Sequence, residues 1–139
     1  MSGPPITLLR LASHGDGRGN LVAIQAGDGA LPFEIRRVYY IYGVPEGQAR
    51  GMHSHRQLTQ LMIAVSGRVD VVLDNGQGRS HVTLDDPAVG LLIQPMTWRE
   101  MTYFAPGSVC LVLASLPYDE SDYIRDYKEF CVANHNCGG

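Results

Sequence analysis

The residues of this chain whose types and spacing could do chemistry are two histidines, His53 and His55, in the segment GQARGMHSHRQLTQLMIAVSG from Gly47 to Gly67. Residues i and i+2 of a strand face the same side of a sheet, so both imidazoles would project together. Such a pair can ligate a metal, transfer protons or stand on a solvated surface. If no metal is bound, two neutral imidazoles in a concave site are suited to proton transfer, because histidine titrates near neutral pH.

The elements that must position this pair are expected to be short strands. Segments rich in Val, Ile, Leu and Tyr recur between Gly, Pro, Asp and Asn residues, a pattern typical of an all-β sandwich or barrel. The expected strands are residues 6–12, 20–26, 36–43, 51–56, 60–67, 68–74, 80–84, 88–95, 97–104 and 108–115. A helix is expected at residues 120–132, where aromatic residues recur at spacings of three and four behind acidic residues.

Length and charge limit the class of protein. A chain of 139 residues is the size of one domain, which we expect at residues 1–132, followed by a flexible tail at 133–139. The net charge of -3 gives no basic surface for nucleic acid. The sequence has neither a long apolar run for a membrane span nor a signal sequence. We therefore expect a cytoplasmic protein that binds neither nucleic acid nor membrane.

The spacing around the histidines resembles the first motif of the cupin superfamily, a small jelly-roll β-barrel fold. The motif positions are occupied by Gly47, His53, His55, Gln60 and Gly67. Metal-binding cupins have glutamate at the position of Gln60. Replacing that carboxylate with a neutral amide removes ligand charge and disfavours a metal.

The second cupin motif also departs from the metal-binding pattern. A third histidine is expected near a proline, but the segment AVGLLIQPMTWREM contains none. Arg99 stands where that ligand is expected, and its permanent charge repels a cation. Only a shift of one residue, which would bring Glu100 to this position, restores a carboxylate. We expect no metal and no other cofactor.

Five longer segments narrow the resemblance to one family. They read DGRGNLVAI, PFEIRRVYYIY, RGMHSH, LDDPAVGLLIQPMTWREM and LASLPYDESDYIRDY. Across about residues 16–130 the chain resembles the nucleotide-sugar 3,4-ketoisomerases. The resemblance implies an all-β cupin jelly-roll β-barrel with a short C-terminal helix. It also implies a homodimer that exchanges N-terminal strands and works without metal.

The same resemblance implies the reaction. These enzymes move the ketone of dTDP-4-keto-6-deoxy-D-glucose from C4 to C3, which yields a dTDP-3-keto-6-deoxyhexose for deoxyaminosugars in surface glycans or natural products. The step needs a base, an acid and a partner for the enediolate oxygen. We expect His53 and His55 to supply base and acid, with His55 as the main base and His53 relaying the proton.

A tyrosine and an arginine complete the expected catalytic group. By strand alternation Tyr39 faces one side of its strand, whereas Tyr40 and Tyr42 face the other, and Tyr39 is favoured for the cavity. Most of these rings could equally serve packing alone. Arg99 cannot give up a proton at neutral pH, so it would stabilise the enediolate by its charge.

The remaining candidates are expected to bind substrate. Arg50 resembles the arginine that anchors the phosphates in related cupins, and a guanidinium suits a bidentate contact with diphosphate oxygens. Arg18 lies in a segment that reaches toward the active site in the family. The further candidates are Gln60, Trp98 and Glu100. The position of Arg99 resembles relatives that retain the gluco configuration at C4, whereas Arg18 resembles relatives that make the galacto product.

Three other functions stay open at this point. A nucleotide-sugar 3,5-epimerase of the rhamnose pathway shares the barrel and the R-G-x-H segment, but usually pairs one histidine with a carboxylate, whereas here H-x-H stands alone. A non-catalytic cupin would bind a ligand without turning it over. A metal-dependent cupin dioxygenase would carry a bound metal.

Overall fold

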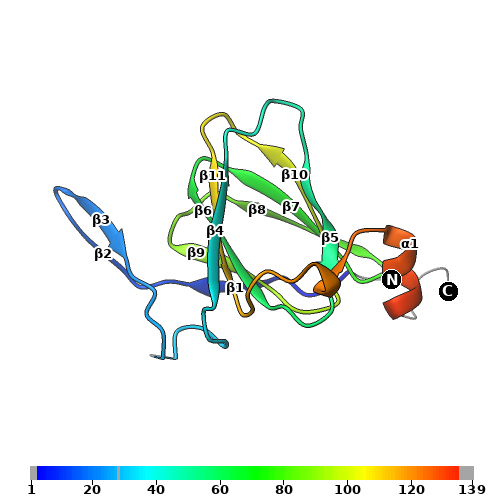
Figure 1. Cartoon of the computed structure of the whole chain (residues 1–139). Coiled ribbons are helices and arrows are strands. Elements are labelled where there is room, and N and C mark those ends of the chain that lie inside the picture. The colour runs from blue at the N-terminus through cyan, green and yellow to red at the C-terminus, as the bar shows by residue number, and fades with distance from the viewer. Residues whose placement is uncertain (1–2, 28, 135–139) are drawn as a thin grey trace.

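The computed structural model describes residues 3–27 and 29–134. Within these residues the chain forms two five-stranded antiparallel sheets and a separate two-stranded hairpin (Figure 1). The strands are β1 (Thr7–Arg10), β2 (Ser13–Asp16), β3 (Gly19–Val22), β4 (Arg37–Tyr42), β5 (Arg50–His55), β6 (Gln60–Ser66), β7 (Val69–Asp74), β8 (Arg79–Leu84), β9 (Val89–Ile93), β10 (Trp98–Phe104), β11 (Val109–Ala114) and β12 (Tyr123–Ile124). A 3-10 turn covers Glu120–Asp122, and helix α1 covers Tyr127–Asn134.

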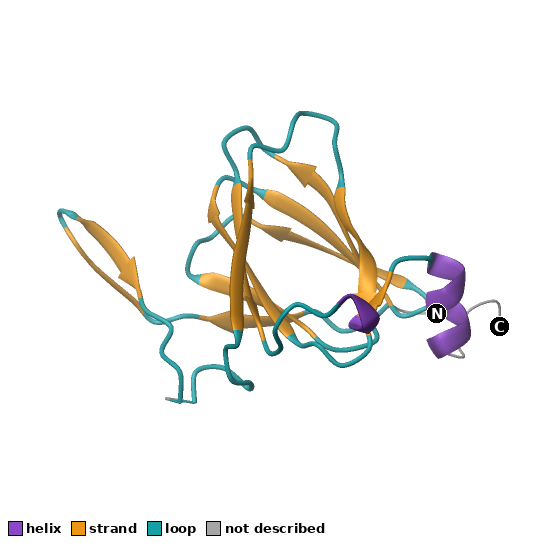
Figure 2. Ribbon diagram, in the orientation of Figure 1, coloured by secondary structure: helices purple, strands orange, loops and turns teal. Residues whose placement is uncertain are grey.

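The two sheets face each other as the layers of a jelly roll (Figure 2). Their strand orders are β1-β9-β6-β11-β4 and β12-β5-β10-β7-β8. The expected all-β jelly roll is confirmed, although the hydrogen bonding is divided between two sheets and does not close into one barrel. β4, which carries Tyr39, and β5, which carries Arg50, His53 and His55, belong to opposite sheets. Side chains on their inner faces can therefore meet across the space between the layers.

Apolar side chains from both sheets fill most of that space. The buried members of this core are Met62, Ala64, Val69, Val71, Leu73, Leu84, Leu91, Ile93, Met101, Phe104, Cys110 and Val112. Burying one such aliphatic side chain contributes about 2 kcal/mol. β6 also buries its outer face, where Leu61 and Ile63 pack with Phe33 and Ile35 of the segment before β4. A rigid double layer therefore supports the strands around the site.

Hairpin β2–β3 stands away from both sheets (Figure 1). A strand was expected at residues 20–26, but the strand is shorter, at Gly19–Val22, and its partner Ser13–Asp16 was not expected. All of β2 is exposed, and Leu21 of β3 is 60% exposed. A strand with no buried face has no alternation of apolar and polar residues, which explains why β2 was missed.

The expected helix at residues 120–132 is wrong in its first half. Asp119 caps a 3-10 turn by accepting a hydrogen bond from the Ser121 amide, and Tyr123 and Ile124 then pair with β5 opposite His55 and Ser54. This pairing draws the segment against the second sheet, so α1 begins only at Tyr127.

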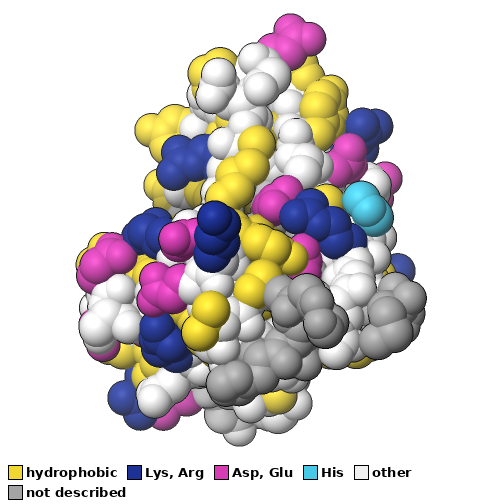
Figure 3. Space-filling view, turned by 90° about the vertical axis from the view of Figure 1, so that its right-hand side faces the viewer, with side chains coloured by type: hydrophobic (Ala, Val, Ile, Leu, Met, Phe, Trp, Pro, Cys, Tyr) yellow, Lys and Arg dark blue, Asp and Glu magenta, His cyan; other side chains and the backbone are white. Residues whose placement is uncertain are grey.

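Helix α1 packs on the outside of the second sheet, as expected for the C-terminal helix. Phe130 is fully buried against Trp98 and Ile124. α1 extends to Asn134, two residues into the expected tail; residues 135–139 of that tail lie outside the described part of the chain. On the face that carries α1, acidic and basic side chains are interspersed (Figure 3). Among the described helices, none is long and apolar enough to cross a membrane.

Candidate active site

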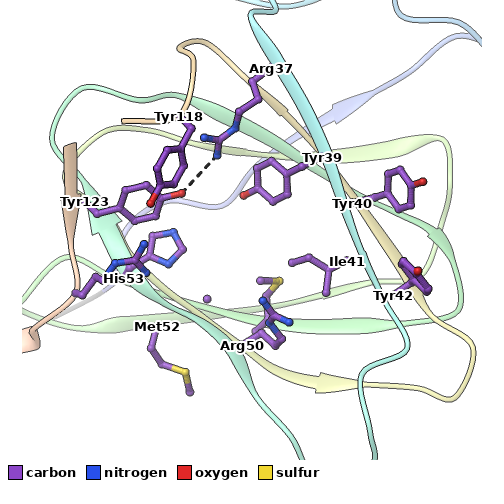
Figure 4. Close-up of a pocket in the computed structure, with 13 residues that line it drawn as sticks. Arg37, Tyr39, Tyr40, Ile41, Tyr42, Arg50, Met52, His53, Tyr118 and Tyr123 are labelled. Carbon is purple, nitrogen blue, oxygen red and sulfur yellow. Dashed lines mark hydrogen bonds between the residues drawn. The ribbon is translucent and has the colours of Figure 1, made fainter. Parts of the chain in front are cut away.

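A cavity of about 660 Å³ opens between β4 and β5. This volume falls in the range of small-molecule sites. Its wall comes from β4, β5, Met101 of β10 and the segment from Tyr118 to Arg125. Tyr39, Tyr123, Arg37 and His53 surround this space from several sides (Figure 4).

The backbone of β5 is left-handed at Gly51, where φ is 73°. This conformation favours glycine. A Cβ there would come within 2.6 Å of Met101 Cε, the end of a flexible side chain that lines the same cavity. The register of β5 against β10 shifts between Arg99 and Met101, next to this position.

His53 and His55 project to the same side of β5, as strand alternation predicts. Their rings meet edge to face with centroids 4.8 Å apart. Only His53 lines the cavity, whereas His55 is 1% exposed and lies behind it. We expected His55 to be the main base. This expectation does not fit the placement of the two rings, because His53 lies in the cavity wall and His55 lies behind it. Neither Nε2 atom has a hydrogen-bond partner among the described residues.

Asp122 is a site residue that the sequence did not reveal. Its Oδ2 lies 3.2 Å from His55 Nδ1, and its Oδ1 accepts a hydrogen bond from the Gln57 amide at 2.8 Å. A carboxylate only accepts hydrogen bonds, so Nδ1 of His55 carries the proton and Nε2 is left as the basic atom. Asp122 lies 67 residues from His55 in sequence. The only signal for it was its place in the YDESDYIRDY segment.

Both histidines are held in the neutral form. Burial lowers the pKa of His53 to about 2 and that of His55 to about 3, and the nearby Arg99 cation acts in the same direction. The Asp122 carboxylate opposes this for His55, because it stabilises an imidazolium. At neutral pH both rings are therefore uncharged, which is the form that a general base requires.

A second group of buried polar residues lies behind Tyr39. Gln60 Nε2 donates to Tyr39 Oη at 2.9 Å, and Gln60 Oε1 accepts from Arg99 Nη1. Tyr39 lines the cavity, as expected, and its side chain is largely buried. Tyr40 and Tyr42 border the cavity at its edge, where 61% and 70% of their surface is exposed and their rings point to the other side of β4 (Figure 4). Burial raises the pKa of Tyr39, so its hydroxyl keeps its proton at neutral pH.

Arg99 is a buried cation that has no counter-ion within residues 3–27 and 29–134. It is 1% exposed, and no Asp or Glu of the described residues forms an ion pair with it. Its neutral partners are Gln60 and the carbonyl oxygen of Thr97. Burial lowers its pKa to about 10, so it remains charged at neutral pH. Arg99 does not line the cavity; its charge acts from behind Tyr39 and His53.

Three arginines line the cavity, and within the described residues no carboxylate joins them there. Arg50 occupies the cavity wall, in line with its expected role in binding substrate. Arg37 lies over the rings of Tyr39 and Tyr118, with distances of 4.9 Å and 5.5 Å from its Cζ to the ring centroids. Arg125 stacks on Tyr123 at 4.1 Å. The cavity is therefore suited to an anionic ligand with a planar group.

Two expected binding residues face the opposite side of β10. Trp98 packs against Phe130 of α1 and donates to Glu100 Oε2 at 3.0 Å. Glu100 also pairs with Arg79 at 3.1 Å. Residues on either side of Arg99 point away from it, because side chains alternate along a strand. The expectation that Trp98 and Glu100 contact substrate does not fit this placement.

Arg18 and Gln60 also lie outside the cavity wall. Arg18 stands on hairpin β2–β3, where it pairs with Asp16 at 2.8 Å and 91% of its side chain is exposed. Gln60 is fully buried, and both ends of its amide are used within the protein. The expected direct contact of Gln60 with substrate is therefore not supported. The described residues contain no group of three or more His, Cys, Asp or Glu side chains arranged to hold a metal ion.

The chain matches known proteins over nearly its whole length. The family model FdtA, described as WxcM-like, C-terminal, matches residues 5–135. The TDP-4-oxo-6-deoxy-alpha-D-glucose-3,4-oxoisomerase of Aneurinibacillus thermoaerophilus is 46% identical over 115 residues, which cover 83% of this chain and 82% of that protein.

Solved structures agree with this match. QdtA, a sugar 3,4-ketoisomerase of Thermoanaerobacterium thermosaccharolyticum in complex with TDP, is 42% identical with a TM-score of 0.90, and the match covers 94% of each chain. WlaRB, a TDP-quinovose 3,4-ketoisomerase of Campylobacter jejuni, is 42% identical with a TM-score of 0.84, over 90% of this chain and 95% of that one.

Proposed function

The chain belongs to the FdtA family, and on that premise we propose that it is a sugar 3,4-ketoisomerase that converts dTDP-4-keto-6-deoxy-D-glucose into a dTDP-3-keto-6-deoxyhexose. The names of its relatives support the reaction and the nucleotide-linked substrate. The product is a ketosugar that an aminotransferase can use, which fits a place in deoxyaminosugar biosynthesis.

The observation that carries this proposal is the charge distribution around the cavity. Arg99 is a buried guanidinium with no counter-ion among the described residues, and it lies close to two imidazoles that burial keeps neutral. A buried cation is unfavourable unless a negative charge compensates it. An enediolate supplies that charge only while the reaction proceeds, so the site is more complementary to the intermediate than to the neutral ketosugar.

The reaction needs only proton transfers. The base takes the proton from C3, the electrons of that bond form a C3–C4 double bond, and the former carbonyl oxygen at C4 becomes negative. The intermediate then takes a proton at C4, while the oxygen at C3 loses its proton and becomes the new carbonyl. One hydrogen moves from C3 to C4 and one from the C3 oxygen to the C4 oxygen, so no oxidant is consumed.

His53 is proposed as the base at C3, because it is the imidazole in the cavity wall. His55 lies behind it with Asp122 on its Nδ1 and is proposed to share the proton through its free Nε2. Tyr39 is proposed to donate a hydrogen bond to the oxygen that becomes negative. Arg99 stabilises this charge from behind the wall. We propose that these steps need no metal.

The nucleotide is proposed to bind along the arginines of the cavity. Arg37, Arg50 and Arg125 bring three positive charges to the wall, and guanidinium groups bind diphosphate oxygens in a bidentate manner. Arg50 is the proposed anchor, since no ion pair among the described residues engages it. Arg125 already pairs with Glu120 at 2.9 Å.

We also propose a homodimer that exchanges N-terminal strands. Hairpin β2–β3 projects from the sheets and leaves Leu21 exposed (Figure 1), so a second copy could cover it. Such an exchange would also bring Arg18 toward the partner's cavity. Sedimentation that finds only monomers at micromolar concentration would reject this arrangement.

The runner-up is a nucleotide-sugar 3,5-epimerase. The sequence argument against it was that the H-x-H pair has no carboxylate partner, and the His55–Asp122 contact at 3.2 Å makes that argument wrong. The epimerase is now disfavoured by the matches to ketoisomerases over most of the chain. It would remove a proton from C5, which makes the two functions separable by experiment.

The test is proton NMR of dTDP-4-keto-6-deoxy-D-glucose incubated with the wild-type protein in the presence of EDTA. The proposal predicts a product with its ketone at C3, so the signal of H3 disappears and a signal of H4 appears. The coupling of H4 to H5 gives the configuration at C4, which distinguishes the gluco from the galacto product. Recovery of unchanged substrate would favour a non-catalytic binding protein, and activity that EDTA abolishes would favour a metal enzyme.

A further inference from the structure

The amide of Gln60 has only one chemically allowed orientation. Arg99 has donors and no acceptor, so the amide atom that faces Arg99 must be the oxygen. The NH₂ group of Gln60 then faces Tyr39 Oη, at 2.9 Å. Because an amide NH₂ only donates, Tyr39 Oη must accept this hydrogen bond. Because Arg99 can only donate, it fixes the direction of both hydrogen bonds in the chain that runs from Arg99 through Gln60 to Tyr39.

The consequence lies in the hydroxyl hydrogen of Tyr39. One lone pair of its oxygen is occupied by Gln60, so the hydrogen is directed away from Gln60. Tyr39 lines the cavity, and among the described residues Gln60 is the hydrogen-bond partner of its hydroxyl. The hydrogen is thus available to a ligand in the cavity.

We propose that Gln60 is a positioning residue that holds Tyr39 as a hydrogen-bond donor to the enediolate. This inference rests on the proposed ketoisomerase function and assigns to Gln60 a role other than binding substrate. Gln60 is fully buried and does not line the cavity, so it acts through Tyr39. The Arg99 cation polarises the amide, which strengthens the hydrogen bond to Tyr39.

Gln60→Glu distinguishes two roles for Gln60, packing alone and orientation of the Tyr39 hydroxyl hydrogen. Gln60→Glu preserves the shape of the side chain and gives Arg99 a carboxylate, so packing and stability are retained. The carboxylate cannot donate, because Arg99 keeps it ionised. Tyr39 must then donate its hydrogen to residue 60 and can no longer donate it to the substrate.

The first readout is the rate of ketone migration. Gln60→Glu is expected to lower kcat roughly 100-fold, the usual effect of losing one oxyanion donor, with KM changed less than about 2-fold, because the neutral ground state needs this donor little. Gln48→Glu adds the same charge on an exposed loop residue and is expected to keep wild-type kcat. A wild-type kcat in folded Gln60→Glu would overturn the inference.

The second readout is a double-mutant cycle of Gln60→Met with Tyr39→Phe. Methionine removes the NH₂ donor to Tyr39 without neutralising Arg99, whereas Gln60→Glu changes both. If Gln60 acts through Tyr39, the double variant loses no more kcat than the larger of the two single losses. Multiplied losses would overturn the inference. If Gln60→Glu fails to fold, Gln60→Met, which is neutral and of similar length, also replaces it in the rate measurement.

The third readout does not depend on turnover. NMR of ring-labelled tyrosine, with Tyr39→Phe to assign the signal, gives the pKa of Tyr39 directly. Gln60→Glu is expected to raise this pKa, because the carboxylate accepts the proton of the phenol and repels a phenolate. An unchanged or lowered pKa would overturn the inference. An inactive wild-type protein would reject the proposed function alone and leave this readout to decide the role of Gln60.

Discussion

Replacing Asp122 with asparagine is predicted to lower kcat about 100-fold without unfolding the protein. Asp122 accepts two hydrogen bonds, one from the Gln57 amide at 2.8 Å and one from His55 Nδ1 at 3.2 Å. Asparagine offers one acceptor and one donor. If its oxygen keeps the Gln57 amide, its NH₂ faces His55 and forces the ring proton onto Nε2. The basic atom of His55 is then blocked.

The magnitude follows from the distance and the burial. Two unit charges 3.2 Å apart attract by roughly 5 kcal/mol at an effective dielectric constant of about 20. This is the upper limit of what Asp122 contributes when His55 is protonated. Because the charge on His55 is only partial in the transition state and the amide keeps a dipole, we expect about half of it. A loss of about 2.7 kcal/mol corresponds to a 100-fold lower rate.

The assay is the initial rate of ketone migration at saturating substrate, followed by NMR. Asp126→Asn is the matched control, because Asp126 is exposed, lies on the same segment and accepts a hydrogen bond from the Lys128 amide that asparagine can keep. Thermal unfolding of both variants checks the fold. A folded Asp122→Asn with wild-type kcat would refute the role of Asp122 in orienting His55.

Three further predictions concern the cavity wall. His53→Asn is expected to lower kcat by roughly 1000-fold with little change in KM, because it removes the base at C3; initial rates at varied substrate would show this, and a near-normal kcat would exclude His53 as the base. Arg50→Gln is expected to raise KM roughly tenfold through a lost phosphate contact, with the exposed Arg56→Gln as control; an unchanged dissociation constant for TDP would argue against the contact. As the pH is lowered from 6.5 to 5.5, the free energy of unfolding is expected to fall by roughly 2 kcal/mol through His53 and His55. The unfolded chain binds protons at both histidines in this range, whereas the folded pKa values are about 2 and 3. Urea unfolding should lose this pH dependence in the double variant His53→Asn, His55→Asn, and an equal fall in that variant would contradict the assignment.

The features that follow from the strand pattern, in which side chains alternate between the two faces of a sheet, could be predicted from the sequence. Nearly all core strands were found, because their runs rich in Val, Ile and Leu stand between Gly, Pro, Asp and Asn residues; strands with one exposed face, such as β4 and β8, also show the alternation of period two. The same rule placed His53 with His55 and separated Tyr39 from Tyr40. It also contradicts the grouping of Trp98 with Arg99, since neighbours on a strand face opposite sides.

The features of the site that could not be predicted from the sequence depend on contacts between segments that are distant along the chain. Asp122 reaches His55 only because β12 pairs with β5, and the aromatic spacing that suggested a helix gave no sign of that pairing. Arg37 and Arg125 read as ordinary surface arginines until the fold places both at one cavity. The order of His53 and His55 from the cavity is likewise a property of the assembled sheets, because alternation gives the side of a residue but not its depth.

The most direct test of the central claim is to run the reaction in deuterium oxide and locate the isotope by NMR. If protons move between C3 and C4 through an enediolate, wild-type protein yields a 3-keto product with deuterium at C4 and hydrogen at C5, and His53→Asn yields none. Deuterium at C5 with the ketone still at C4 would contradict the account and indicate an epimerase.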